Sequence, residues 1–101
     1  MDKDLEEKII AELKTVYDPE IPVNIYDLGL IYDINGINGK IEIEMTLTAP
    51  GCPVADDIVA EVKAKVLNIK EIKEVYVSLV FDPPWSQEMM TEEAKLELGM
   101  L

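Results

Sequence analysis

The sequence predicts an α+β fold in which helices pack on one face of a small mixed sheet. Three observations lead to this class. The length of 101 residues suits one domain, so we expect residues 1–101 to form a single unit. Alternating apolar and polar residues indicate strands, and apolar residues at helical spacing indicate helices. These patterns follow one another in the order α-β-β-α-β-α, which is typical of an α+β domain.

The first helix is expected from about Asp2 to Val16. Its apolar residues recur at the spacing of a helix that packs one face on a core: Leu5, Ile9, Leu13 and Val16. Asp18-Pro19 ends this helix, because the residue before a proline is disfavoured in helical angles. Residues 18–29, DPEIPVNIYDLG, combine turn formers with apolar residues, and we expect an ordered loop on the surface.

A hairpin of two strands follows the loop. In the first strand Leu30, Tyr32 and Ile34 alternate with Ile31 and Asp33. The second, residues 41–48, has four apolar residues facing inward and four polar ones facing outward. Asn35-Gly36 and Asn38-Gly39 are both turn signals, because Asn and Gly accept positive φ angles. We therefore expect the hairpin connection to contain both dipeptides.

The rest of the chain predicts a helix, a third strand and a short terminal helix. The next helix has one apolar stripe: Val54, Ile58, Val62 and Val66. A strand from about Glu74 to Phe81 points alternate apolar residues one way, and Asp82-Pro83-Pro84 stops it, because prolines cannot donate to a sheet ladder. A last helix over 91–98 is expected to be capped by Thr91 and ended by Gly99.

Composition excludes several functions. The chain has 9 Lys and Arg against 21 Asp and Glu, a net charge of −12, and no His. Phosphate backbones and anionic membranes repel so acidic a protein, so neither nucleic acid nor membrane is an expected partner. Without His, a serine-protease triad or Cys-His pair cannot be built. The charged start lacks a secretory signal, and a lone cysteine forms no internal disulfide, so a cytoplasmic location is expected.

Cys52 is the first candidate for chemistry, because it is the chain's single thiol. It lies in the turn Pro50-Gly51-Cys52-Pro53, and Pro53 suits the first position of the following helix, so Cys52 is the expected N-cap. The positive end of the helix dipole there favours the thiolate, which binds metal or attacks electrophiles. Asp56 and Asp57 oppose this effect. The alternative is a buried cysteine that only packs.

Polar residues on either side of this turn are further candidates. Three carboxylates lie close together in the first loop: Asp18, Glu20 and Asp27. They could act as hard ligands, as general bases or as acceptors for the loop's own amides. Thr46 and Thr48 lie on the polar face of the second strand, toward the end that leads to Cys52, although threonine is also an ordinary strand residue.

The late segment Pro83-Pro84-Trp85 with Met89 and Met90 is stiff and apolar. Trp and Met are enriched at contact surfaces, so these residues are candidates for binding a partner. They could equally pack back over the sheet as a lid on the core. The residue types alone leave both alternatives open.

Three long segments together resemble one family. They are DPEIPVNIYDLGLIY at 18–32, MTLTAPGCP at 45–53 and LVFDPPWSQEMMTEEAKLELG at 79–99. In order and spacing they are similar to the small iron–sulfur cluster assembly domain called SufT-like or PaaD-like, also known as domain of unknown function fifty-nine. The resemblance covers almost the whole chain, and the family's α-β-β-α-β order agrees with the elements expected from periodicity.

The resemblance implies a role in iron–sulfur protein maturation, as an auxiliary factor rather than a metabolic enzyme. The family's cysteine falls on Cys52, and its other motifs fall on residues that we expect to support the site or to contact partners: Asp18, Glu20, Asp27, Thr46, Thr48, Pro83, Pro84 and Trp85. Because the second strand ends beside the cysteine, we expect the site residues to converge on Cys52. Members with a phenylacetate-oxygenase role carry a cysteine-rich tail, which this sequence does not show.

A single thiolate limits what the chain can do with a cluster. Iron–sulfur clusters generally take about four thiolate ligands, so a monomer would hold none stably. A transient cluster would be shared with a second chain, either through paired Cys52 residues of a homodimer or with ligands from a partner. The resemblance implies an iron–sulfur scaffold or a P-loop carrier ATPase of the Mrp type, together with apo client proteins, as partners.

Two rival functions remain beside the cluster assembly factor. The first is a non-catalytic interaction or adaptor module that presents a client or carrier, with a structural Cys52. The second is a thiol enzyme that uses Cys52 as nucleophile and a loop carboxylate as base, which the absence of His disfavours.

Overall fold

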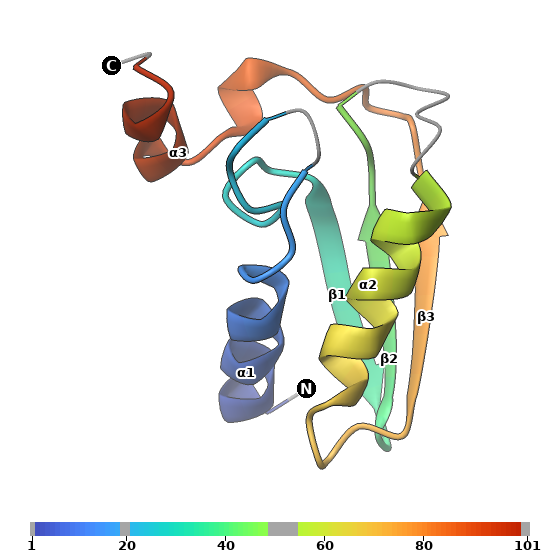
Figure 1. Cartoon of the computed structure of the whole chain (residues 1–101). Coiled ribbons are helices and arrows are strands. Elements are labelled where there is room, and N and C mark those ends of the chain that lie inside the picture. The colour runs from blue at the N-terminus through green and yellow to red at the C-terminus, as the bar shows by residue number, and fades with distance from the viewer. Residues whose placement is uncertain (1, 19–20, 49–54, 100–101) are drawn as a thin grey trace.

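In the computed structural model, which describes residues 2–18, 21–48 and 55–99, three α-helices and three strands follow one another in the order expected from the sequence (Figure 1). The elements are α1 (Lys3–Leu13), β1 (Ile31–Ile37), β2 (Lys40–Met45), α2 (Ala55–Leu67), β3 (Glu74–Leu79) and α3 (Glu92–Glu97), with a short 3-10 turn, η1, at Gln87–Met89. No helix in these ranges is long and apolar enough to cross a membrane.

The sheet is mixed, as expected. Its described strands lie in the order β1-β2-β3, with β1 antiparallel to β2 and β2 parallel to β3. The parallel pair needs a crossover, and α2 supplies it. Figure 1 shows α1 and α2 side by side over one face of the sheet, with α3 beyond the end of the sheet. The core between these two helices and the sheet includes Ile9, Leu13, Ile41, Ile43, Val62 and Val66.

The hairpin turn is at Asn38-Gly39 alone, which corrects the expectation that both dipeptides form the connection. Asn38 and Gly39 have φ angles of 52° and 81°. Asn35-Gly36 lies inside β1 and pairs with β2. In this register Ile34 lies opposite Ile43, so both apolar side chains face the helices; a one-residue slip would turn one of them to solvent.

The loop between α1 and β1 is part of the core, whereas the sequence predicted a surface loop. Its apolar residues Val23, Ile25 and Leu28 are all buried. The loop can lie inside because its backbone groups find partners. A bridge pairs Tyr17 with Asn24, and the amide of Ile25 donates to the carbonyl of Val16 at 2.8 Å.

Two strands are shorter than expected. β2 ends at Met45 rather than Thr48, because the next amide, that of Thr46, donates to the loop carbonyl of Leu30 at 2.8 Å. Thr46 is 1% exposed, so it does not belong to an open polar face as the alternation predicted. β3 ends at Leu79, before the predicted Phe81.

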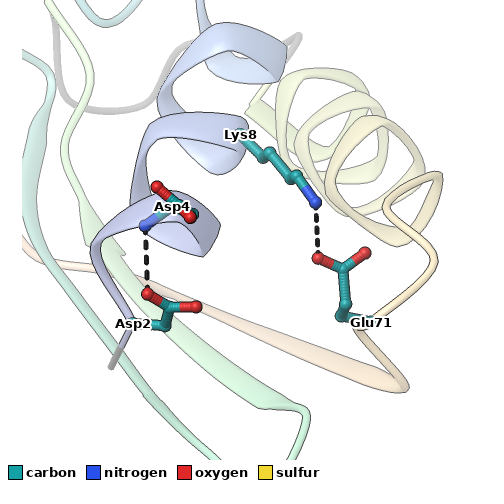
Figure 2. Close-up of polar contacts among 4 residues, drawn as sticks. All are labelled: Asp2, Asp4, Lys8 and Glu71. Carbon is teal, nitrogen blue, oxygen red and sulfur yellow. Dashed lines mark hydrogen bonds and ion pairs between the residues drawn. The ribbon is translucent and has the colours of Figure 1, made fainter.

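An ion pair joins α1 to the turn between α2 and β3 (Figure 2). The Lys8 ammonium lies 2.6 Å from a Glu71 carboxylate oxygen, and at the start of the same helix the Asp2 side chain accepts from the amide of Asp4. The hydrogen bond with Glu71 raises the pKa of Lys8 above its ordinary value. The hydrogen bond with Lys8 lowers the pKa of the Glu71 carboxyl.

Candidate functional site

The segments that carry the candidate site meet at one end of the molecule. Figure 1 shows residues 21–30, residues 46–48 and the start of α2 at that end. Five of the predicted site residues lie outside the described residues: Glu20, Pro50, Gly51, Cys52 and Pro53. The N-cap position of Cys52, its exposure and the convergence of the site on it therefore stay predictions.

Asp18 is held inside the loop. It is 7% exposed, and its Oδ1 accepts from the amide of Ile21 at 3.0 Å. The Asp18 amide in turn donates to the carbonyl of Val23 at 3.4 Å. An aspartate that accepts an amide farther along the chain stabilises a turn, so Asp18 shapes this loop whatever other role it has.

Asp27 forms a reciprocal pair with Asn24. The Asp27 amide donates to Asn24 Oδ1, and Asn24 Nδ2 donates to Asp27 Oδ2, both at 2.9 Å. Asn24 was not among the residues predicted from the sequence. Its signal was the spacing Asn-x-x-Asp, which has the form of a capping box, in which two residues satisfy each other's groups across one turn.

Thr46 and Thr48 have different surroundings. Thr46 is buried, whereas Thr48 is half-buried. The amide of Thr46 donates to the carbonyl of Leu30, at the end of the loop. The Leu30 amide in turn donates to the carbonyl of Ile25 at 3.1 Å. The last part of β2 and the loop are thus one hydrogen-bonded unit, which places Thr46 next to the loop that carries Asp18 and Asp27.

Residues 83–91, which we call the strap, pack back over the loop. Trp85 Nε1 donates to the carbonyl of Leu28 at 2.7 Å, and Tyr32 Oη donates to the carbonyl of Pro83 at 2.7 Å. The amide of Thr91 reaches the carbonyl of Asp27 at 2.9 Å. Of the two alternatives for this segment, the structure therefore favours the lid for its tryptophan.

The other strap residues divide between core and surface. Met90 is buried with the core, whereas Pro83 and Pro84 are exposed. Met89 is half-buried, and its Sδ lies 3.6 Å from Tyr32 Oη. The proline turn and residues 86–88 are exposed, so these are the parts of the strap that a partner can reach.

Gly29 fixes where the strap rests. Its φ of 81° is in the left-handed region, and the backbone of Met89 lies so close that a Cβ on Gly29 would collide with the Met89 carbonyl. Glycine alone meets both conditions, a positive φ and a close backbone approach. The strap therefore packs directly on the Asp-Leu-Gly turn of the loop.

A hollow opens where the strap meets the sheet. It has a volume of about 710 Å³ and is lined by Gly29, Ile31, Tyr32, Glu44, Val80, Asp82, Pro83 and Met89. Among residues 2–18, 21–48 and 55–99, no group of three or more His, Cys, Asp or Glu side chains is arranged to hold a metal ion. The one soft ligand of the chain, Cys52, lies outside those ranges.

Comparison with known proteins gives consistent matches. Residues 6–79 match the family model described as iron-sulfur cluster assembly protein. The chain is 56% identical over 97 residues to the Fe-S protein maturation auxiliary factor of Porphyromonas gingivalis, covering 95% of this chain and 92% of that protein. It is 33% identical over 98 residues to the iron-sulfur cluster carrier protein of Mycobacterium tuberculosis, covering 96% of this chain but 24% of the carrier.

A solved structure has the same fold. The crystal structure of a Domain of Unknown Function DUF59 from Bacillus anthracis superposes with a TM-score of 0.88 at 44% sequence identity, over 98% of this chain and 95% of that one. The likeness therefore extends over nearly the full length of both chains.

Proposed function

The chain belongs to the iron–sulfur cluster assembly protein family, and from this membership we propose that it is a maturation factor that helps to deliver clusters to client proteins. One observation carries the proposal: a protein named as a maturation auxiliary factor is 56% identical to it over 95% of the chain. The protein would act by binding and handing over its cargo, as an auxiliary factor rather than an enzyme.

Cys52 is the proposed ligand for the cargo. It is the one thiol in the sequence, and a thiolate suits iron and sulfide better than a carboxylate or hydroxyl oxygen does. A cluster with about four ligand positions would be held by Cys52 only in passing, while a second chain supplies the others. That second chain is either another copy of this protein or a carrier or client.

The proposed partners are a cluster carrier and apo client proteins. The chain matches almost its full length to 24% of the M. tuberculosis carrier protein, which supports joint action of such a domain with a carrier. We propose that a separate P-loop ATPase of the Mrp type is that carrier here. The proposed setting is the cytoplasm, where thiols stay reduced. A net charge of −12 favours partners with basic surfaces.

The described residues around the site would serve as its frame. The buried Asp18, the Asn24–Asp27 pair and Thr46 hold the loop against the end of β2. The strap lies across the loop and leaves the proline turn exposed for a partner. A rigid frame suits a transient ligand, because a preorganised group binds with less loss of conformational entropy.

The test is a Cys52→Ala variant with two readouts. An N-cap residue contributes at most about 1 kcal/mol, so the melting temperature should change little. Anaerobic reconstitution with iron and sulfide, and the activity of a cluster-dependent client in cells, should both be lost. Ser86→Ala is the matched control, because Ser86 is exposed and its side chain makes no cap hydrogen bond.

The opposite results distinguish the rival function. A well-folded Cys52→Ala variant that supports normal client activity would contradict the ligand role and favour the adaptor module. A melting temperature lowered by the loss of a few kcal/mol, with client activity following the folded fraction, would indicate a buried structural cysteine.

A further inference from the structure

β3 presents an open edge to the solvent among the described elements. It is the last strand in the order β1-β2-β3, and Figure 1 shows it at the margin of the sheet. The amide of Glu74 donates to the carbonyl of Gly39, just before β2, at 3.2 Å, and the amide of Val80 donates to the carbonyl of Met45 in β2 at 2.8 Å. Along a parallel strand, every second residue directs its N–H and C=O groups to the neighbouring strand. The even-numbered residues of β3 bond to the β2 side, so the backbone groups of the odd-numbered residues point away from β2. These residues are Val75, Val77 and Leu79.

The other edge of the sheet is protected. The pairing of β1 with β2 is interrupted by a bulge between Ile31 and Asp33. In an antiparallel ladder, alternate residues of a strand bond to the neighbouring strand. Ile37, the last residue before the hairpin turn, bonds to β2, and so does Asn35. The amide of Ile34 therefore points away from β2. Asp33 Oδ1 accepts from this amide at 3.0 Å. A bulge and a carboxylate on an edge amide both discourage pairing with another strand.

β3 has no such device. Residues 75–81, VYVSLVF, carry no charge and consist mainly of β-branched and aromatic residues. Tyr76 is 53% exposed and Phe81 is 46% exposed. A β-prone edge strand whose one charge is on its first residue, Glu74, is a template for another strand, and proteins normally block such edges unless they use them.

We propose that β3 pairs with β3 of a second copy of this chain, antiparallel about a two-fold axis at Val77, so that two sheets become one. Val77 would face Val77 of the second copy, and Val75 would face Leu79 at both ends. All the outward backbone groups of β3 would then be used, in about six hydrogen bonds. The interface is isologous, as in most homodimers.

The charges of β3 favour this register over its neighbour. On the helix-free face, Tyr76 would lie opposite Ser78 of the second copy and diagonal to its Tyr76, within reach of an aromatic contact. Glu74 would lie opposite Val80, with the two Glu74 residues about 20 Å apart. A two-fold axis at Val75 would instead place the Glu74 residues diagonally adjacent. A net charge of −12 on each copy works against self-association, and a register that opposes no two acidic residues adds least to that repulsion.

This dimer has a consequence for the cargo. The segment with Cys52 connects the end of β2 to the start of α2, and β2 and β3 are parallel, so their carboxyl ends lie at one end of the sheet. Antiparallel pairing sends those ends in opposite directions. The two copies would therefore carry separate cargo sites, and the remaining ligands for a cluster would come from a different protein. The dimer itself does not depend on the proposed role of Cys52.

The first experiment measures the mass of the full chain by sedimentation equilibrium over a wide range of concentration. We expect a monomer–dimer equilibrium. Tyr76→Glu places like charges diagonally across the interface and should raise the dissociation constant about tenfold. Ile37→Glu is the matched control: Ile37 is 73% exposed on β1, and β2 lies between it and the open edge of β3, so its variant should dimerise normally. Circular dichroism verifies that both variants fold.

The second experiment tests the register. In a Cys52→Ser background, Val77→Cys should form a covalent dimer on mild oxidation, because directly paired Cα atoms about 5.5 Å apart suit a disulfide. Ile37→Cys in the same background should not. A wild type that stays monomeric, a Tyr76→Glu variant that dimerises normally, or a Val77→Cys variant that does not cross-link would each overturn the proposal. Loss of the dimer in Cys52→Ser would also overturn the proposal, because it would show that the two copies associate through the Cys52 thiol and not through β3.

Discussion

The two ends of this molecule each depend on a glycine with the same backbone angle. Gly39 in the hairpin turn and Gly29 in the loop both have a φ of 81°. At the hairpin end, a Cβ on Gly39 would lie 3.3 Å from the Glu71 carbonyl oxygen, whereas a Cβ on Gly29 would collide with the backbone of Met89. The hairpin glycine serves a local turn, and the loop glycine serves a contact with a segment far along the chain.

The same difference holds for the hydrogen bonds of the two ends. The hairpin turn closes between neighbours in the sequence, Ile37 and Lys40. The loop end is fastened by Trp85 to Leu28 and by Tyr32 to Pro83, over separations of 57 and 51 residues. The hairpin turn is specified by its own chemistry, although that end of the molecule also has distant contacts such as the Lys8–Glu71 pair. The contact between the loop and the strap forms only when two distant parts of the chain meet.

The largest expected effect is at Gly29. Gly29→Ala combines a positive φ with a backbone collision and should destabilise the fold by about 3 kcal/mol. Gly39→Ala should cost only about 1 kcal/mol, because its neighbours can shift slightly. Urea denaturation measures both. Gly99→Ala isolates the cost of positive φ, since nothing lies within 4 Å of its Cβ position. Equal losses at Gly29 and Gly39 would contradict the distinction between the two ends.

The next effect concerns the strap. Trp85→Phe removes the donor to the Leu28 carbonyl and leaves a part-buried acceptor unsatisfied, with an expected loss of about 2 kcal/mol. Tyr32→Phe removes the more exposed bond to Pro83 and should lose about 0.5 kcal/mol. Hydrogen exchange of the loop amides shows where the loss is felt. If Trp85→Phe accelerated hydrogen exchange more in the hairpin than in the loop, relative to wild type, the strap would not be what stabilises the loop.

The smallest effect is a pH dependence at the hairpin end. The pKa of Glu71 is lowered in the folded state, so its stabilisation is present above the unfolded pKa and is lost as pH falls through the folded pKa. The pKa of Lys8 is raised, so its stabilisation is present below its unfolded pKa and is lost as pH rises through the folded pKa. The pair is exposed, so the contribution is small.

Melting temperature against pH checks this directly. Wild type should be slightly more stable than Glu71→Gln near neutral pH, and the difference should vanish in acid as Glu71 becomes protonated. Glu74→Gln is the control, because Glu74 lies 3.7 Å from Lys40 in a looser pair. A difference between wild type and Glu71→Gln that grows on acidification would contradict the assigned sign.

The elements that the sequence predicted correctly are those with local causes. Thr91 caps α3 by accepting from the Ala94 amide, and the alternation at Ile41 and Ile43 marks β2. The choice of turn was not local: Asn35-Gly36 has the composition of a turn, but the pairing of Ile34 with Ile43 overrides it. Register depends on which face is buried, and a dipeptide does not carry that information.

The loop end was predicted less well for the same reason. Leu28 and Trp85 are far apart in the sequence, so nothing near the loop indicated that the strap would bury it. The candidate site was predicted from a resemblance, and the family match confirms that resemblance. The roles of Cys52 and the residues around it stay predictions. Asp18 stabilises a turn, as its residue type suggested, but it does so from a buried position. Thr46 is buried, although the alternation predicted an open strand face.

The contact between Trp85 and Leu28 also equips the protein with an optical reporter. Trp85 is the one tryptophan in the sequence, so the tryptophan fluorescence of the chain comes from a single indole. That indole is half-buried and donates to a loop carbonyl. Any event that lifts the strap exposes the ring to water and shifts its emission to longer wavelength. Strap docking is thereby visible in the unlabelled protein, at the end of the molecule where partners are proposed to bind.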